Sequence, residues 1–130
     1  MKNKGATMKK LIFLLMILTL VGCSNSNESI SLKGESDNWK GEYIANINIS
    51  DNSEEGTYTF VYKDGNSNIN FKNLKIDIND GETDRNEEDY REEIVQIPRS
   101  CSGCSVTNKS IPIKVTIKWD NKKEETFYLK

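Results

Sequence analysis

The chain has 130 residues, a formal net charge of −2 and no histidine. The missing histidine removes the commonest general base and the commonest zinc ligand, which disfavours Ser–His or Cys–His catalysis and zinc sites. The acidic balance disfavours nucleic-acid binding, because that activity requires a basic surface. We therefore expect no metal, no cofactor and no nucleic-acid partner, which leaves carboxylate-based enzymes and binding proteins as the open classes.

Residues 1–22 have the composition of an export signal. Four lysines precede a run of twelve uncharged residues, 11–22. A helix of that length spans about 18 Å, whereas the hydrocarbon core of a bilayer is about 30 Å thick. The segment is therefore too short for a stable transmembrane anchor and fits a signal peptide that is cleaved.

The uncharged run ends in Leu20-Val21-Gly22-Cys23. This sequence resembles the lipobox of bacterial lipoproteins, in which a small residue precedes the lipidated cysteine. The resemblance implies cleavage between Gly22 and Cys23, a diacylglyceryl group on the Cys23 thiol, and an amine open to a further acyl chain such as palmitate. Two or more acyl chains hold a protein stably at a membrane, so we expect a lipid anchor on the extracytoplasmic face of the cell membrane. The alternative is an ordinary signal peptide followed by a chance cysteine.

Residues 23–29 comprise the lipidated N-terminus and a small, polar stretch that predicts a flexible tether. Residues 30–130 then form one small domain. Removing residues 1–22 takes away four lysines and no acid, which leaves 14 basic and 20 acidic residues and a net charge of −6. Anionic headgroups should repel such a chain, so the acyl chains are expected to hold it at the membrane.

Apolar and polar residues alternate along most of this domain, which predicts β-strands with one buried face. We expect strands at 30–35, 39–50, 57–63, 68–79, 94–97, 111–119 and 124–130. The segment 51–56 is a predicted turn, and 64–67 is a predicted hairpin turn because glycine and asparagine tolerate positive φ. Within 68–79 the apolar phase flips, which predicts a bulge or break at Asn73, or two short strands in different sheets. Pro98 is expected to end its strand.

The segment 81–93 holds seven acids and two arginines, which predicts a solvated loop with a helical turn near 87–91. Seven or eight short strands without a long helix predict an all-β fold, an antiparallel two-layer sandwich. An immunoglobulin-like sandwich, in architecture only, is one candidate, and a small β-barrel is the alternative.

Two segments resemble a known group of proteins. Gly34-Glu35-Ser36-Asp37-Asn38-Trp39 is similar to the start of the domain in small uncharacterised lipoproteins of Bacillus-type bacteria. Their ending is similar to residues 113–120 of this chain followed by Lys123-Glu124-Glu125. The resemblance implies a lipoprotein with a β-domain of unassigned activity, and it brings no catalytic residues.

Cys101-Ser102-Gly103-Cys104 has three interpretations. A thioredoxin-type redox site requires a cysteine at a helix N-terminus, and the flanking residues are a poor helix start. A zinc site needs four ligands, which the mature chain does not supply as cysteine or histidine. A loop-closing disulfide between Cys101 and Cys104 is favoured and fits an extracytoplasmic compartment, with free thiols as the remaining alternative.

Three further candidates have ordinary explanations. The acidic stretch 77–84 fails the spacing of an EF-hand loop, so a solvated loop is favoured over a calcium site. Glu35 with Asp37, or Glu87 with Glu88, would be a glycosidase pair only at a carboxylate separation that sequence does not give. Six aromatic residues could line a groove, although the apolar faces place most of them in the core and leave Tyr90 as an exposed contact: Trp39, Tyr43, Tyr58, Tyr62, Tyr90 and Trp119.

These features predict a membrane-anchored, non-enzymatic binding or interaction module. The expected partner is a protein or polymer of the cell envelope. The alternative function is a cell-envelope enzyme or inhibitor that acts on cell-wall polymers.

Overall fold

The computed structural model describes residues 27–65 and 68–130. The predicted signal peptide, the cleavage and lipid site at Gly22 and Cys23, and tether residues 23–26 lie outside the described residues. Within the described part, no helix has the length and hydrophobicity needed to cross a membrane.

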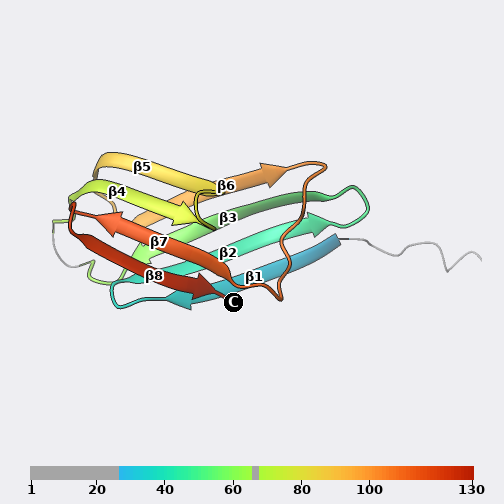
Figure 1. The fold of residues 1–130 in the computed structure, drawn as a ribbon, viewed down its shortest axis with the longest axis horizontal. Coiled ribbons are helices and arrows are strands. Elements are labelled where there is room, and N and C mark those ends of the chain that lie inside the picture. The colour runs from blue at the N-terminus through green and yellow to red at the C-terminus, as the bar shows by residue number, and fades with distance from the viewer. Residues whose placement is uncertain (1–26, 66–67) are drawn as a thin grey trace, which may run out of the picture.

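Eight antiparallel strands form two sheets that pack face to face (Figure 1). One sheet has the order β1-β2-β3-β6 and the other the order β5-β4-β7-β8. The strands are β1 (Asn27–Glu35), β2 (Trp39–Asn48), β3 (Ser53–Tyr62), β4 (Phe71–Ile78), β5 (Thr83–Tyr90), β6 (Ile94–Cys101), β7 (Ile113–Trp119) and β8 (Lys123–Leu129). The predicted all-β two-layer sandwich is confirmed. The alternative barrel is not formed, because no strand ladder joins β5 to β6 in the described chain.

The strand order differs from that of immunoglobulin domains. In those domains the first two strands share a sheet with the fourth and fifth. Here the first three strands share a sheet with the sixth. The likeness to an immunoglobulin domain is therefore limited to the two-layer architecture.

The apolar side chains that alternate along the strands fill the space between the two sheets. Trp39, Tyr43, Tyr58 and Trp119 are at most 1% exposed, so the prediction that these aromatic residues belong to the core is confirmed. Trp39 contacts Tyr62 and Trp119 at ring-centroid distances of 5.1 and 5.7 Å, in edge-to-face arrangements. Such pairs stabilise a core beyond the area they bury.

Two isoleucines continue the core pattern in sequence but lie outside the core. β2 and β7 are each two residues shorter than the strands predicted at 39–50 and 111–119. Ile49 is therefore left 56% exposed and Ile111 62% exposed. These are the two highest values among the exposed large hydrophobic residues of the described chain.

Three other predicted boundaries are wrong. β1 begins at Asn27, so residues 27–29 of the predicted tether belong to a sheet. β3 begins at Ser53, so most of the predicted turn 51–56 is strand. The segment 64–67 does not close a hairpin, because it connects β3 in one sheet to β4 in the other.

The predicted phase flip within 68–79 is confirmed. Lys72 and Asn73 are consecutive exposed residues between the buried Phe71 and Leu74. Asn73 has a φ of 48°, a conformation that asparagine tolerates better than most residues. The strand therefore changes which side chains face the core without leaving its sheet.

β5 occupies most of the segment predicted as a solvated loop with a helical turn, and that prediction is wrong. β5 pairs only with β4 and forms an edge of its sheet. An edge strand at the margin of the sandwich does not need an apolar face, because little of it is covered. Charged side chains on such a strand discourage pairing with other chains.

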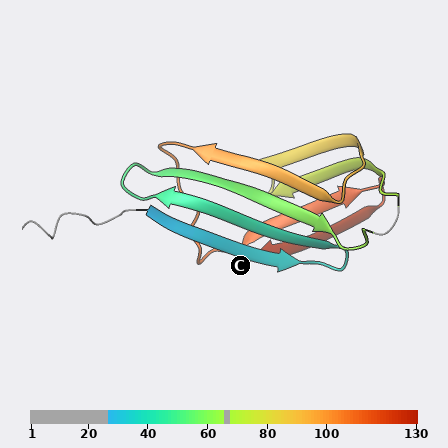
Figure 2. The ribbon, with the colours of Figure 1, turned by 180° about the vertical axis from the view of Figure 1, so that it is seen from behind.

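β6 runs through Pro98 instead of ending before it. Figure 2 shows β6 at the edge of its sheet, where no further strand of the described chain pairs with it and a residue without an N–H is tolerated. Side chains of β5 cover this edge. Arg85 donates to the Gln96 carbonyl at 2.7 Å, and the Tyr90 hydroxyl donates to the Ile94 carbonyl at 2.6 Å. Tyr90 is therefore half-buried and engaged, which corrects its prediction as an exposed contact.

At the opposite edge of that sheet, β1 is joined to the end of the chain. Lys33 and Lys130 exchange two backbone hydrogen bonds, of 3.1 and 2.9 Å. Gly34 is required here, because a Cβ atom at this position would lie 2.0 Å from the Tyr128 carbonyl oxygen. The two sheets therefore touch along the β1–β8 edge.

The two segments that carry the resemblance to Bacillus-type lipoproteins meet in the structure. Ser36 and Asn38, in the β1–β2 turn, donate three hydrogen bonds of 2.6 to 2.8 Å to the Glu125 carboxylate in β8. Burial alone would raise the pKa of Glu125, but these hydrogen bonds hold it below its usual value. Both segments therefore have a structural role at one site.

Candidate functional site

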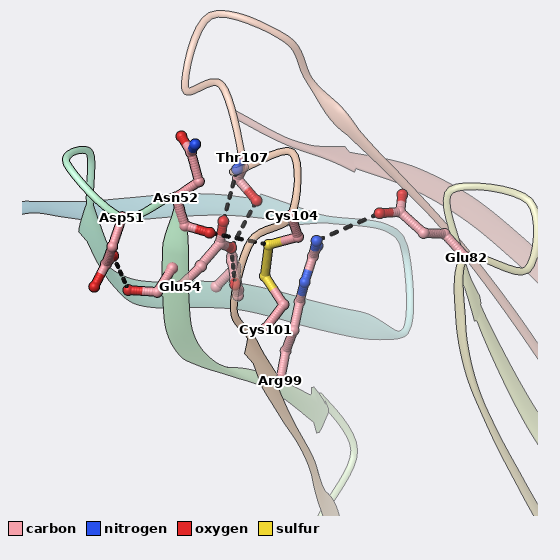
Figure 3. Close-up of a disulfide and its surroundings, with 10 residues drawn as sticks. Asp51, Asn52, Glu54, Glu82, Arg99, Cys101, Cys104 and Thr107 are labelled. Carbon is pink, nitrogen blue, oxygen red and sulfur yellow. Dashed lines mark hydrogen bonds and ion pairs between the residues drawn. A yellow bond between two sulfur atoms is a disulfide. The ribbon is translucent and has the colours of Figure 1, made fainter.

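The β6–β7 connection carries the most distinctive cluster of side chains (Figure 3). Cys101, the last residue of β6, forms a disulfide with Cys104. The Cys104 N–H donates to the Asn52 carbonyl in the β2–β3 turn at 3.1 Å. Residues 102–107 form bends and coil, so the helix that a thioredoxin-type site requires is not present at these cysteines. The disulfide and the turn contact fix the start of the connection against the neighbouring turn.

Glu54 is the most unusual residue of the cluster, because it is a carboxylate only 1% exposed on the core face of β3. Its Oε1 accepts a 2.6 Å hydrogen bond from the Thr107 N–H. Its Oε2 accepts hydrogen bonds from the Thr107 hydroxyl, at 2.7 Å, and from the Tyr43 hydroxyl. Three donors from two other segments therefore satisfy this buried carboxylate.

The electrostatics of the cluster keep Glu54 ionised. Burial alone would raise its pKa, but hydrogen bonds from Tyr43 and Thr107 and the nearby charge of Arg99 hold the pKa of Glu54 below its usual value. The pKa of Tyr43 is raised, first by burial and then by its hydrogen bond to Glu54. The Tyr43 hydroxyl therefore keeps its proton and donates a hydrogen bond to Glu54.

Arg99 links this cluster to the other sheet. Its side chain is 16% exposed, and its Nη2 lies 3.4 Å from Oε1 of Glu82 in the β4–β5 turn. The Tyr58 hydroxyl is buried beside Arg99. Burial raises the pKa of Tyr58, and the hydrogen bond and positive charge of Arg99 oppose that rise.

The arrangement of Glu54 is that of a structural carboxylate. A general acid or nucleophile must reach a substrate, whereas Glu54 is buried and its oxygens already accept three donors. Sequence analysis missed Glu54 because it placed residues 51–56 in a turn. The alternating pattern could have identified it, because Glu54 is an even number of residues from Tyr58 and Phe60 and therefore shares their face of β3.

A second candidate site is an open groove on the outer face of the first sheet. It has a volume of about 550 Å³ and is lined by Lys33, Gly34, Glu35, Lys40, Gly41, Glu42, Thr59 and Val61. Its carboxylates are accompanied by lysines: Lys33 Nζ lies 3.6 Å from Glu42, and Lys63 Nζ lies 3.0 Å from Glu35. The hydrogen bond and charge of Lys63 hold the pKa of Glu35 below its usual value.

The carboxylates of the two pairs considered from sequence have different surroundings. Glu35 is engaged by Lys63, while Asp37 lies in the β1–β2 turn. Glu87 is half-buried and lies 3.0 Å from Arg85 Nη2, whereas Glu88 is exposed. Successive strand residues point to opposite faces, so the side chains of Glu87 and Glu88 diverge, although both border one open hollow beside Asn86.

The acidic stretch 77–84 forms the end of β4, a turn and the start of β5. Asn79, Asp80 and Gly81 have positive φ, as a tight turn between paired strands requires. Among the residues that the structure describes, no group of three or more Cys, Asp or Glu side chains is placed to hold a metal ion.

Comparisons with known proteins add no relative. No protein-family model matches the sequence, and neither a curated protein nor a solved structure matches it.

Proposed function

We propose that this chain is a lipoprotein anchored through Cys23 on the extracytoplasmic face of the cell membrane, where its sandwich is a non-enzymatic binding or interaction module. The basic and apolar N-terminal segment and the sequence before Cys23 support the anchor. Such an anchor would lie close to the domain, because β1 begins four residues after Cys23. The disulfide between Cys101 and Cys104 fits an oxidising compartment.

The contacts of four carboxyl groups with hydrogen-bond donors or lysines support the non-enzymatic part of the proposal. An acid–base enzyme built on carboxylates needs one whose pKa is raised, so that it can donate a proton near neutral pH. Four described carboxyl groups have shifted pKa values, and every shift is downward: Glu35, Glu54, Asp89 and Glu125. These groups are suited to hold hydrogen bonds and ion pairs.

The groove beside Lys33 and Lys40 is the surface that we assign to partner binding. Positive and negative side chains alternate across it, because Lys33 pairs with Glu42 and Glu35 pairs with Lys40 in the strand register. Charged surfaces of this kind give specificity and orientation to a partner. The expected partner is a protein or polymer of the cell envelope.

Metabolic labelling with an alkyne-bearing fatty acid tests the anchor. The wild-type protein should carry the label, and Cys23→Ala should lose it. The double variant Cys101→Ser/Cys104→Ser is the matched control, because it removes the other two cysteines and should keep the label. An unlabelled wild-type protein that retains residues 1–22 would contradict the proposed anchor and location.

Hydrolysis of cell-wall polymers tests the non-enzymatic assignment. Purified wild-type protein should release no more soluble fragment than buffer does. Turnover by the wild type that disappears in Glu35→Gln or Glu42→Gln would instead establish the enzyme alternative. Glu55→Gln is the control, because Glu55 is exposed on β3 away from the groove lining.

A further inference from the structure

The two most exposed large apolar side chains lie in the two segments that approach the start of β1. Ile49 is in the β2–β3 turn and directly follows the residue that pairs with the first residue of β1. Ile111 is in the β6–β7 connection, two residues after Lys109, whose Nζ lies 2.9 Å from Glu28 of β1. Both views show the β2–β3 turn and the start of β1 at one end, and the β6–β7 connection running from that end to the start of β7 (Figures 1 and 2).

The length of chain before β1 decides which end of the domain meets the membrane. An extended chain advances at most about 3.6 Å per residue, so the start of β1 lies within about 14 Å of Cys23. The β1–β2 turn is a further nine residues away along a strand, about 30 Å. If Cys23 is lipidated, as proposed above, the end that carries Ile49 and Ile111 is held close to the bilayer.

We propose that this end of the sandwich rests on the lipid surface, with Ile49 and Ile111 inserted at the boundary between headgroups and acyl chains. The occupant of this surface is the bilayer that already holds the acyl chains. The two inserted side chains are apolar, so zwitterionic lipids suffice for their insertion. The acidic domain gains nothing from anionic headgroups.

The cluster around Glu54 gives this surface a fixed shape. Thr107 is bound to Glu54, the Cys101–Cys104 disulfide closes the start of the connection, and Lys109 pairs with Glu28. The segment that presents Ile111 is therefore held at several points instead of moving freely in solvent. A fixed apolar contact orients the domain on the membrane and leaves the groove at the other end of β1 facing away from it.

Fluorescence quenching by lipids brominated in their acyl chains tests this orientation. The lipidated protein is reconstituted into phosphatidylcholine vesicles, with tryptophan placed singly as Ile49→Trp or Ile111→Trp. Both variants should lose emission and shift to shorter wavelength in brominated vesicles, relative to the signal of the two buried native tryptophans. Ile94→Trp is the matched control, since Ile94 is 43% exposed at the far end and should not be quenched.

Each outcome of this experiment decides one question. Mass spectrometry of the N-terminal peptide first establishes whether Cys23 carries the diacylglyceryl group, and its absence would overturn the proposed function and this inference together. Lipidated protein in which neither Ile49→Trp nor Ile111→Trp is quenched overturns the inference alone. Equal quenching of Ile94→Trp also overturns it, because the domain would then have no fixed orientation. Quenching that depends on anionic lipid or low salt would contradict an apolar contact.

Discussion

Replacing Glu54 with glutamine keeps the size of the side chain and removes its charge. In the native protein the carboxylate accepts three hydrogen bonds, one from the Tyr43 hydroxyl and two from Thr107. The glutamine carbonyl can still accept from the Thr107 N–H, and its amide can donate to both hydroxyls once these rotate. Three charge-assisted hydrogen bonds become neutral ones, and each change costs about 1 kcal/mol. We therefore expect Glu54→Gln to lose about 2–3 kcal/mol of unfolding free energy.

Urea unfolding followed by the fluorescence of the buried tryptophans measures this loss. Glu55→Gln is the matched control, because the neighbouring carboxylate is exposed and should change stability by less than about 0.5 kcal/mol. Glu54→Leu should cost more than Glu54→Gln, because it leaves three donors without an acceptor. The reasoning is refuted if Glu54→Gln is as stable as Glu55→Gln.

Three other predictions concern pH, the disulfide and the β1–β8 edge. The pKa of Glu54 is lower in the folded protein than its ordinary value of 4.5, so the stability it contributes is present above that value and is lost as the pH falls below it. The urea midpoint should fall less steeply in Glu54→Gln than in the wild type as the pH is lowered from 7 to 3, a range that extends about two units on either side of that pKa. Identical slopes would contradict this role of the Glu54 carboxylate. Cys101→Ser/Cys104→Ser should lose about 2 kcal/mol of unfolding free energy, as expected for a short closed loop. Mass spectrometry that finds both cysteines of the native protein blocked by a thiol reagent would instead show that no disulfide forms. Gly34→Ala should lose about 1–3 kcal/mol because its Cβ has no room beside the Tyr128 carbonyl, and a melting temperature equal to that of the wild type would show that β1 and β8 can separate there.

The alternation of apolar residues predicted most of the sandwich, because strands buried on one face must repeat every second residue. The flip at Asn73 was predictable for the same reason. β5 was not predicted, because an edge strand held by Arg85 and backbone pairing needs no apolar repeat. Pro98 misled the prediction of β6 for a related reason, since proline excludes a central strand but not an edge strand.

The Glu54 cluster shows a second limit of sequence reasoning. The spacing of Cys101 and Cys104 was enough to favour a local disulfide. The partners of Glu54 lie 11 and 53 residues away along the chain, and no local pattern pairs them. A carboxylate in a sequence favours a turn assignment, because the hydrogen-bond donors that allow its burial are brought to it only by the tertiary structure.

The contact between the first turn and the last strand also sets the order in which the chain can mature. A chain made from its N-terminus can pair β1, β2 and β3 early, since these strands are neighbours in sequence and in the sheet. Glu125 and Lys130 follow all four strands of the first sheet in sequence, so β8 can contact β1 and the β1–β2 turn only after those strands have been made. Pairings between distant segments slow folding and prolong the exposure of apolar surface. We therefore expect the β1–β8 edge to form after the β1-β2-β3 meander.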